Sequence, residues 1–268
     1  MGCLATLLAS ASARAESPYS VEVPFAISVT AASVLGALTT TEIPLSKALW
    51  TSEILGELDD GLHGPRSSTP DLVSDLSLAA TILLPPVGIA SAGFDEDAAR
   101  GALIYVETHA IALLLNSTVK RLVSRPRPYA YASDPRPEND DAFLSFYSGH
   151  ASAAFAAATA GSILYAVRTS DPVALPILTG TAMALAASTA VLRARARMHF
   201  PSDILIGALA GTAIGAAVSL LQLAESPELG VAEGIAALGG IAAGALVAAI
   251  LPFDSPIVSS VGGLGATF

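Results

Sequence analysis

The chain has 268 residues, of which 53% are hydrophobic and 13% charged, and its mean hydropathy is +0.62. A composition this apolar excludes an ordinary soluble domain of this size, and a net charge of −10 argues against nucleic-acid binding. The single cysteine, Cys3, excludes a disulfide framework within the chain.

The apolar residues fall into long blocks separated by polar stretches, which is typical of a polytopic membrane protein. The two main polar stretches, residues 51–71 and 129–146, read as loops outside the membrane. The sequence therefore predicts an all-α membrane helix bundle of about six spans, within a membrane-embedded core of residues 23–223. The six predicted spans are residues 23–41, 76–94, 101–119, 151–167, 174–192 and 201–223.

The two ends of the chain carry further apolar segments. Residues 1–15 read as the end of a secretory signal peptide, with a short apolar core before an Ala-Arg-Ala cleavage site. A frayed N-terminal helix is the alternative. Residues 231–268 form an apolar C-terminal extension of unknown role, in which residues 231–251 are either a seventh span or a pair of strands.

Three glycines in the last predicted span recur at four-residue spacing: Gly207, Gly211 and Gly215. This spacing places small residues on one face of a helix and permits close approach of a neighbouring backbone. A packing role is therefore favoured over a phosphate-binding glycine loop.

Residues 193–203 join a basic run to a histidine and an aspartate. Pro201 suits the first position of a helix, where its missing N–H is not needed. His199 then lies just before the helix and Asp203 lies in its first turn, where a carboxylate can hold the imidazole in one tautomer and stabilise its cation. Free helix-start N–H groups and guanidinium groups make the same place an anion site. A basic loop before a capped helix is the alternative for this stretch taken alone.

Two upstream stretches carry related chemistry: Lys120 with Arg127-Pro128, and Ser148-Gly149-His150. With these three stretches the chain resembles the type 2 phosphatidic acid phosphatase superfamily, which includes vanadium haloperoxidases. That family's pattern is Lys, six residues, Arg-Pro; then Pro-Ser-Gly-His; then Ser-Arg, five residues, His, three residues, Asp.

Every charged or imidazole position of the pattern is filled, and the resemblance covers roughly residues 101–223. Arg193, His199 and Asp203 match the third element at its spacing. The chain departs from the pattern at Tyr147, where proline is usual, and at Leu192, where serine is usual. Arg125 falls outside the spacing and is interpreted as an accessory loop charge.

The resemblance implies a role for each matched residue in phosphoryl transfer, which needs a nucleophile, charge stabilisation and a protonated leaving group. His199 would be the nucleophile that forms a phosphohistidine, Asp203 would orient it, and His150 would protonate the leaving group. The phosphate would be bound by Lys120, Arg127, Ser148, Gly149 and Arg193. Three fixed cations can take the role that a metal plays elsewhere, so neither a metal nor another cofactor is implied.

The predicted helices bring these motifs to one membrane surface. Lys120 ends the third span, His150 opens the fourth, Arg193 ends the fifth and Asp203 opens the sixth, and alternating helices put all four ends on the same side. By resemblance to bacterial lipid phosphatases, this side of the inner membrane faces the periplasm. The excess of basic residues near the site indicates the cytoplasm instead, by the positive-inside rule.

The expected activity is metal-independent hydrolysis of a phosphomonoester or diphosphate, with a membrane lipid as the expected substrate. A vanadate-dependent haloperoxidase-like enzyme is one alternative. A non-enzymatic membrane protein that retains the fold, such as a transporter or scaffold, is another. The lipid head group and the oligomeric state stay open.

Overall fold

The structure is a computed structural model, and it describes residues 17–47, 59, 63–135, 137–169, 171–225, 230, 237–238, 241, 244–246 and 249. Within these residues there are helices and turns but no strand, so the predicted all-α membrane bundle is confirmed. The predicted signal segment, residues 1–15, lies outside the described residues. The long helices are α1 (Val23–Thr39), α2 (Ser68–Ser91), α3 (Glu96–Val123), α5 (Gly149–Ala166), α6 (Ala174–Arg195) and α7 (Pro201–Leu221). The short ones are η1 (Thr40–Glu42), α4 (Pro128–Tyr131) and η3 (Asp140–Phe143).

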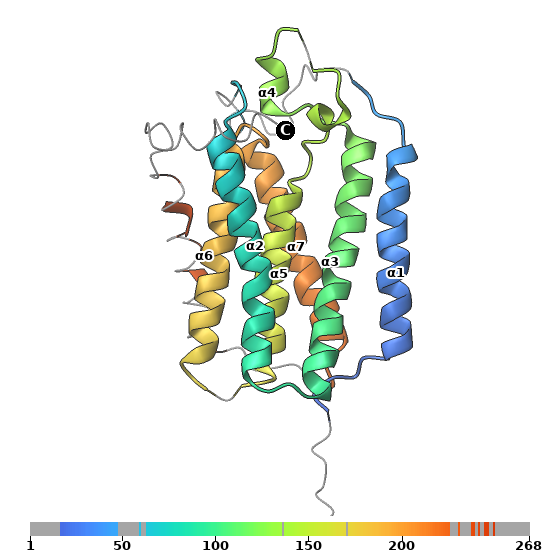
Figure 1. Cartoon of the computed structure of the whole chain (residues 1–268), viewed down its shortest axis with the longest axis vertical. Helices are drawn as coiled ribbons and strands as arrows, with labels where there is room; N and C mark the ends of the chain where they lie inside the picture. Colours follow the sequence, from blue (N-terminus) through green and yellow to red (C-terminus); the bar gives the residue numbers. More distant parts are fainter. Residues whose placement is uncertain are drawn as a thin grey trace, which may run out of the picture.

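The long helices run alternately up and down, and α5 lies in the middle of the bundle (Figure 1). Helices α2, α3, α6 and α7 all contact α5, whereas α1 packs on the outside against α3. Most side chains of α5 are buried, and eight of its residues are alanine. Small side chains let four neighbours approach one central helix closely.

Five helical segments in the described part of the chain are long and apolar enough to cross a membrane: Val23–Glu42, Ser68–Ser91, Glu96–Tyr131, Ala174–Arg195 and Pro201–Leu221. Large apolar side chains on these segments, such as Phe25, Leu83 and Leu209, are exposed on the surface of the bundle. A bilayer would cover them, because exposed apolar patches of this extent are unusual in soluble monomers.

Helices α2 and α3 extend beyond the blocks that the hydropathy pattern predicted. Helix α2 begins at Ser68 instead of residue 76, so the expectation of a loop through residue 71 is wrong for its last four residues. Its polar first turn is stabilised by Asp71, which pairs with Arg66 and Arg193. Helix α3 begins at Glu96 because the Asp95 side chain caps it, accepting a hydrogen bond from the Ala98 N–H at 2.7 Å.

The glycine face of α7 lies directly against the backbone of α5, as the four-residue spacing predicted. A Cβ added at Gly207 would lie 2.5 Å from the Ser148 carbonyl oxygen, and one at Gly211 would lie 2.1 Å from that of Ser152. At Gly215 the corresponding distance is 2.8 Å, to the Ala156 oxygen. These distances leave no room for a side chain, so the glycines set the separation of α5 and α7.

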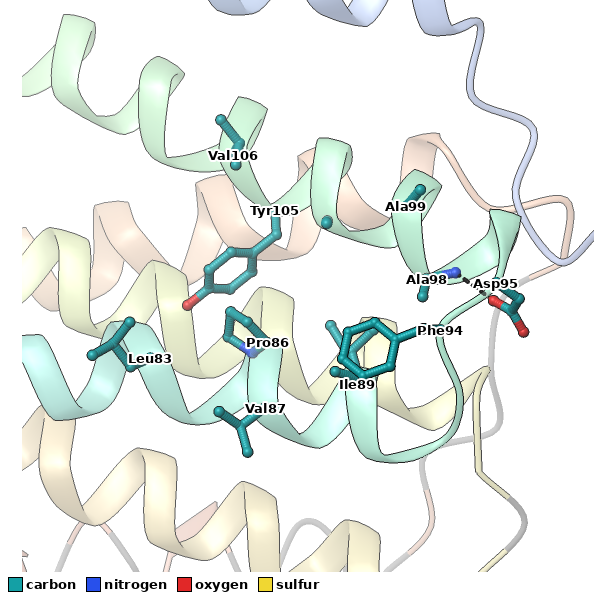
Figure 2. A pocket seen from close by; sticks show the side chains of 12 residues that line it. Leu83, Pro86, Val87, Ile89, Phe94, Asp95, Ala98, Ala99, Tyr105 and Val106 are labelled. Atoms are coloured by element: carbon teal, nitrogen blue, oxygen red, sulfur yellow. Dashed lines mark hydrogen bonds between the residues drawn. The ribbon is translucent and has the colours of Figure 1, made fainter.

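Two adjacent prolines lie inside α2, and Pro86 cannot donate to the Ile82 carbonyl one turn earlier. The Tyr105 hydroxyl of α3 replaces that donor at 2.9 Å. Beside this bond lies a cavity of about 720 Å³ between α2 and α3, at the end remote from the start of α5 (Figure 2). Its lining is almost wholly apolar, so it offers no groups for phosphoryl chemistry.

In the C-terminal extension the structure describes residues 237–238, 241, 244–246 and 249, and all of these are helical. Ala237, Ile241 and Ala245 pack against the core formed by α5 and α6. The Ser188 hydroxyl of α6 also donates to the Gly244 carbonyl at 3.0 Å. These residues therefore lie along α6 as helix and not as strand; the rest of residues 231–268 lies outside the described part.

Candidate active site

Four helix ends meet at the upper end of the bundle in Figure 1: the ends of α3 and α6 and the starts of α5 and α7. Lys120 lies in the last turn of α3, Arg193 in the last turn of α6, and His150 in the first turn of α5. His199 lies in the short connection between α6 and α7. The three sequence-distant motifs thus come together at one end of the bundle.

Backbone hydrogen bonds join the three motifs to one another. The N–H of Ser145, three residues before the second motif, donates to the Arg125 carbonyl at 2.9 Å, which joins that segment to the first motif. The Ser148 N–H donates to the Asp203 carbonyl at 2.9 Å, which joins the second motif to the third. The main chain, and not only the side chains, therefore fixes the relative positions of the motifs.

His199 is buried, with 1% of its surface exposed, and a backbone carbonyl orients its ring. Its Nδ1 lies 2.7 Å from the Ser145 carbonyl oxygen. Because a carbonyl only accepts, Nδ1 of the neutral ring carries the proton, and Nε2 is unprotonated. The nearest oxygen of Asp203 is 3.9 Å from Nδ1, so the carboxylate does not hydrogen-bond the ring directly.

Asp203 is instead held by three donors. Arg125 Nη1 donates to it at 2.6 Å, the Ser145 hydroxyl at 2.6 Å and the Phe200 N–H at 3.0 Å. Arg125 is buried and also pairs with Asp59 at 2.7 Å. Arg125 is thus a structural partner of Asp203, a role that motif spacing did not indicate.

Arg127 lies next to the nucleophile candidate. Its Nη1 is 3.4 Å from His199 Nε2 and donates to the Met198 carbonyl at 3.1 Å. On its other side, Nη2 donates to the Asp141 carboxylate at 2.6 Å and Nε to the Asp141 carbonyl at 2.7 Å. Four contacts therefore fix the guanidinium group beside the imidazole.

Arg193 and Lys120 complete the group of cations. Arg193 Nη1 donates to Asp71 and, at 3.2 Å, to the Ser74 hydroxyl. Ser74 thus supplies a hydroxyl to Arg193 in a chain where Leu192 replaces the serine of the family pattern. Arg193 Nε is buried without a hydrogen-bond partner, and Lys120 has no ion-pair partner among the described residues. Both can donate to a bound anion.

His150, Ser148 and Gly149 lie at the start of α5. Ser148 caps the helix, its hydroxyl accepting from the Ala151 N–H at 3.4 Å. Gly149 is the first helical residue, and a Cβ there would lie 2.7 Å from Asn116 Oδ1, so a larger residue would have to displace the Asn116 amide of α3. His150 Nε2 lies 2.7 Å from Asp75 Oδ1 of α2. Free N–H groups at this helix start face the same end of the bundle as the cations.

Electrostatics keep His199 neutral. Burial is the largest influence, and the Arg127 and Lys120 charges add to it, so the pKa of His199 lies well below the ordinary histidine value. Burial pulls the pKa of Asp141 upward, but the Arg127 charge leaves it below the ordinary aspartate value. At neutral pH the site therefore combines an uncharged imidazole with charged guanidinium–carboxylate pairs, and the arrangement suits nucleophilic attack on an anion.

Sequence reasoning missed the acidic and hydroxyl partners of these residues. None belongs to the family pattern, and each acts by holding a residue that does. Asp71 and Asp75 gave a usable signal, because carboxylates four residues apart at the edge of an apolar block are costly in a membrane unless they are paired. The missed partners are Asp59, Asp71, Ser74, Asp75, Asp141 and Ser145.

Comparison with curated proteins and with solved structures gives no significant match. The family model described as the PAP2 superfamily matches residues 101–226. This range includes most of α3, all of α5, α6 and α7, and all three motifs. Membership supports phosphatase-type hydrolysis in general. Residues 101–226, which carry all three motifs, therefore belong to the PAP2 superfamily, that of the type 2 phosphatidic acid phosphatases.

Proposed function

We propose that this protein is a membrane phosphatase that hydrolyses a phosphomonoester or diphosphate of a lipid through a phosphohistidine at His199, without a metal ion. The observation that carries the proposal is the buried, neutral imidazole of His199, whose unprotonated Nε2 lies 3.4 Å from the Arg127 guanidinium. A lone pair beside fixed cations is what attack on an anionic phosphorus requires.

In the proposed first step, His199 Nε2 attacks the phosphorus as the bond to the leaving oxygen breaks. His150 gives its proton to that oxygen. In the second step His150 takes a proton from water, the water oxygen attacks the phosphorus, and the P–N bond breaks. Inorganic phosphate is released, the neutral imidazole of His199 is regenerated, and His150 is again protonated.

Lys120, Arg127 and Arg193 bind the phosphate oxygens in this proposal. The unpaired Nε of Arg193 and the unpaired ammonium of Lys120 support it, because both are donors without protein partners in the described ranges. Preorganised cations stabilise the charge that spreads over the equatorial oxygens, which is the role a metal ion plays in other phosphatases.

A lipid substrate follows from the position of the site in a membrane bundle. The site lies at the ends of helices that are long and apolar enough to span a bilayer. A phosphate on a lipid head group would meet this end at the membrane surface, while its chains stay in the bilayer. We further propose that the site faces the periplasm, as the resemblance to bacterial lipid phosphatases implies.

The test is phosphate release from lipid phosphates by purified protein in detergent, with chelator present. Wild type should release phosphate and form an acid-labile, base-stable phosphoenzyme. His199→Ala should lose both. Removing the nucleophile of a hydrolase that forms a covalent intermediate lowers kcat by on the order of 10⁶-fold. Activity of His199→Ala within about tenfold of wild type, or complete dependence of the wild type on added magnesium, would contradict the proposal.

A further inference from the structure

Helix α2 brings two carboxylates to the site, one helical turn apart. Asp71 pairs with Arg193 and Arg66, so its charge is matched by two guanidinium groups. Asp75 points to a different partner, with its Oδ1 2.7 Å from His150 Nε2. Helix α2 precedes the segment that matches the family, and no family motif includes either residue.

We propose that Asp75 is the positioning residue of His150, holding the imidazole through Nε2 so that Nδ1 delivers the proton to the leaving oxygen. This inference rests on the function proposed above. A carboxylate only accepts, so the ring nitrogen that faces Asp75 carries a proton. The remaining ring nitrogen, Nδ1, is the atom through which His150 exchanges a proton with substrate.

The charges around His150 explain why it needs a carboxylate. Arg193 of α6 and Lys120 of α3 both oppose a positive charge on the ring, and burial opposes it as well. His199, in the connection before α7, interacts electrostatically with the same ring. Asp75 of α2 acts against these effects without cancelling them, because a carboxylate in contact with an imidazole favours its cation. The cation is the form that can act as an acid.

Asp75 also connects the acid to the phosphate clamp. The same Oδ1 accepts from Arg193 Nη1 at 3.5 Å, so one carboxylate oxygen faces both His150 and Arg193. The proton balance is simple: the Nδ1–H bond of His150 breaks, an O–H bond forms on the leaving group, and Asp75 stays ionised throughout. The role proposed for Asp75 is similar to that of the aspartate in Ser-His-Asp triads. There the carboxylate orients the imidazole and stabilises its cation without taking its proton.

The test compares two leaving groups in Asp75→Asn. An alkoxide leaving group, as in dodecyl phosphate, needs a proton, whereas the nitrophenolate of p-nitrophenyl phosphate leaves without one. The substituted amide keeps the shape of the carboxylate but loses its charge, and its NH₂ group favours the wrong imidazole tautomer. We expect kcat/KM for dodecyl phosphate, which reports the steps up to departure of the leaving group, to fall by at least about tenfold, as part of the 10²–10⁴-fold that general acid catalysis contributes. The kcat/KM for p-nitrophenyl phosphate should fall by a clearly smaller factor, because it excludes the shared dephosphorylation step and only the 3.5 Å contact of Asp75 with Arg193 affects it. The basic limb of the dodecyl phosphate profile should move to lower pH.

Asp71→Asn is the matched control, one turn away on the same helix. It loosens Arg193 without touching His150, so it should slow both substrates alike. In a His150→Gln background, Asp75→Asn should not further change the ratio of activities on the two substrates. Both substitutions remove the same function, proton donation to the leaving group. If Asp75→Asn does not fold, Asp75→Glu is measured in the same way, and it should show the same selectivity at a smaller size.

The outcomes separate the two proposals. Wild type that releases phosphate from neither substrate refutes the proposed phosphatase function, and the role of Asp75 with it. Active wild type together with an Asp75→Asn protein that is unchanged, faster, or slowed equally on both substrates refutes the positioning role alone. A selective loss on dodecyl phosphate supports both.

Discussion

At the scale of single residues, the candidate site contains two kinds of side chain: those proposed to contact the substrate, and those that position them through hydrogen bonds and ion pairs. The Asp203 carboxylate accepts hydrogen bonds from Arg125, from Ser145 and from a backbone N–H at the start of α7. Its link to His199 runs through Ser145, whose hydroxyl donates to Asp203 and whose carbonyl accepts from His199. Ser145 is therefore the residue that joins carboxylate and imidazole.

The lowered pKa of His199 predicts a loss of stability in acid. Below the ordinary histidine pKa of about 6.5, the unfolded chain binds a proton at this position while the folded chain does not. The unfolded state then holds more protons, so the free energy of unfolding falls as pH falls, by about 1.4 kcal/mol per pH unit until the lowered folded pKa is reached. Unfolding midpoints in detergent between pH 7 and pH 5 would measure this. His199→Gln should show a shallower decline, and an identical decline in both proteins would contradict the prediction.

Arg125 offers a second prediction at this scale. Its removal in Arg125→Met leaves Asp203 and Asp59 buried without their guanidinium partner. Breaking a buried pair in this way costs about 3–5 kcal/mol, which thermal unfolding in detergent would detect. Arg100→Ala is the control, since it removes only the exposed ion pair with Glu96 and should cost less than about 0.5 kcal/mol. Equal losses in the two variants would show that Arg125 is not the stabilising partner of Asp203.

At the scale of helices, the contact between α5 and α7 is the tightest in the site. The start of α5 carries His150, and the start of α7 carries Asp203, four residues after His199. Gly207 lies against the Ser148 carbonyl at the start of α5. Backbone contact there holds the two catalytic histidine candidates at a fixed separation.

Gly211→Ala should therefore destabilise the protein. Its Cβ would lie 2.1 Å from a backbone oxygen of α5, and overpacking of this kind costs about 1–3 kcal/mol. Gly36→Ala is the matched control at the contact of α1 with α3, where the new Cβ would meet only the end of the Leu114 side chain, at 3.0 Å. Both changes gain the same helix propensity, so a lower unfolding midpoint in Gly211→Ala alone would isolate the clash. Equal midpoints would mean that α7 can shift away from α5.

The sequence predicted the helices well in their apolar centres and poorly at their ends. Hydropathy cannot detect the first turn of α2, because Asp71 is stabilised there by arginines that are remote in sequence. Motif spacing selected Arg127, which the structure places beside His199. It could not reveal that Asp75 faces His150, since that contact depends on how α2 is rotated against α5. Partners set by helix rotation leave no periodic signal in one sequence.

At the scale of the whole molecule, basic residues gather at the site end of the bundle. The opposite turns carry Arg100 and Arg168 among the described residues. Several cations at the site end already pair with local carboxylates, as Lys47 and Arg121 do with Asp140. Paired charges are weak markers of topology under the positive-inside rule, which reads the surplus of lysine and arginine in short loops. The crowding is thus compatible with a periplasmic site.

Single-cysteine labelling would determine the orientation. In a Cys3→Ser background, Ala132→Cys places a thiol on the exposed surface just after α4 at the site end, and Ala92→Cys places one in the exposed turn between α2 and α3. A membrane-impermeant thiol reagent should label Ala132→Cys in intact cells and Ala92→Cys only after lysis. The reverse pattern would put the site in the cytoplasm.

The enclosure of α5 by its neighbouring helices has a consequence for engineering this protein. Substitutions that widen or narrow the gap between α5 and α7 would move the proposed nucleophile relative to the proposed acid, so these helices are poor targets for a library that seeks new substrates. The polar segment that includes α4 and η3 contacts the site through Arg127 and Asp141 but lies outside the helix stack. Diversity placed in the exposed positions of that segment would reshape the approach to the phosphate while the distance between the two histidines stays the same.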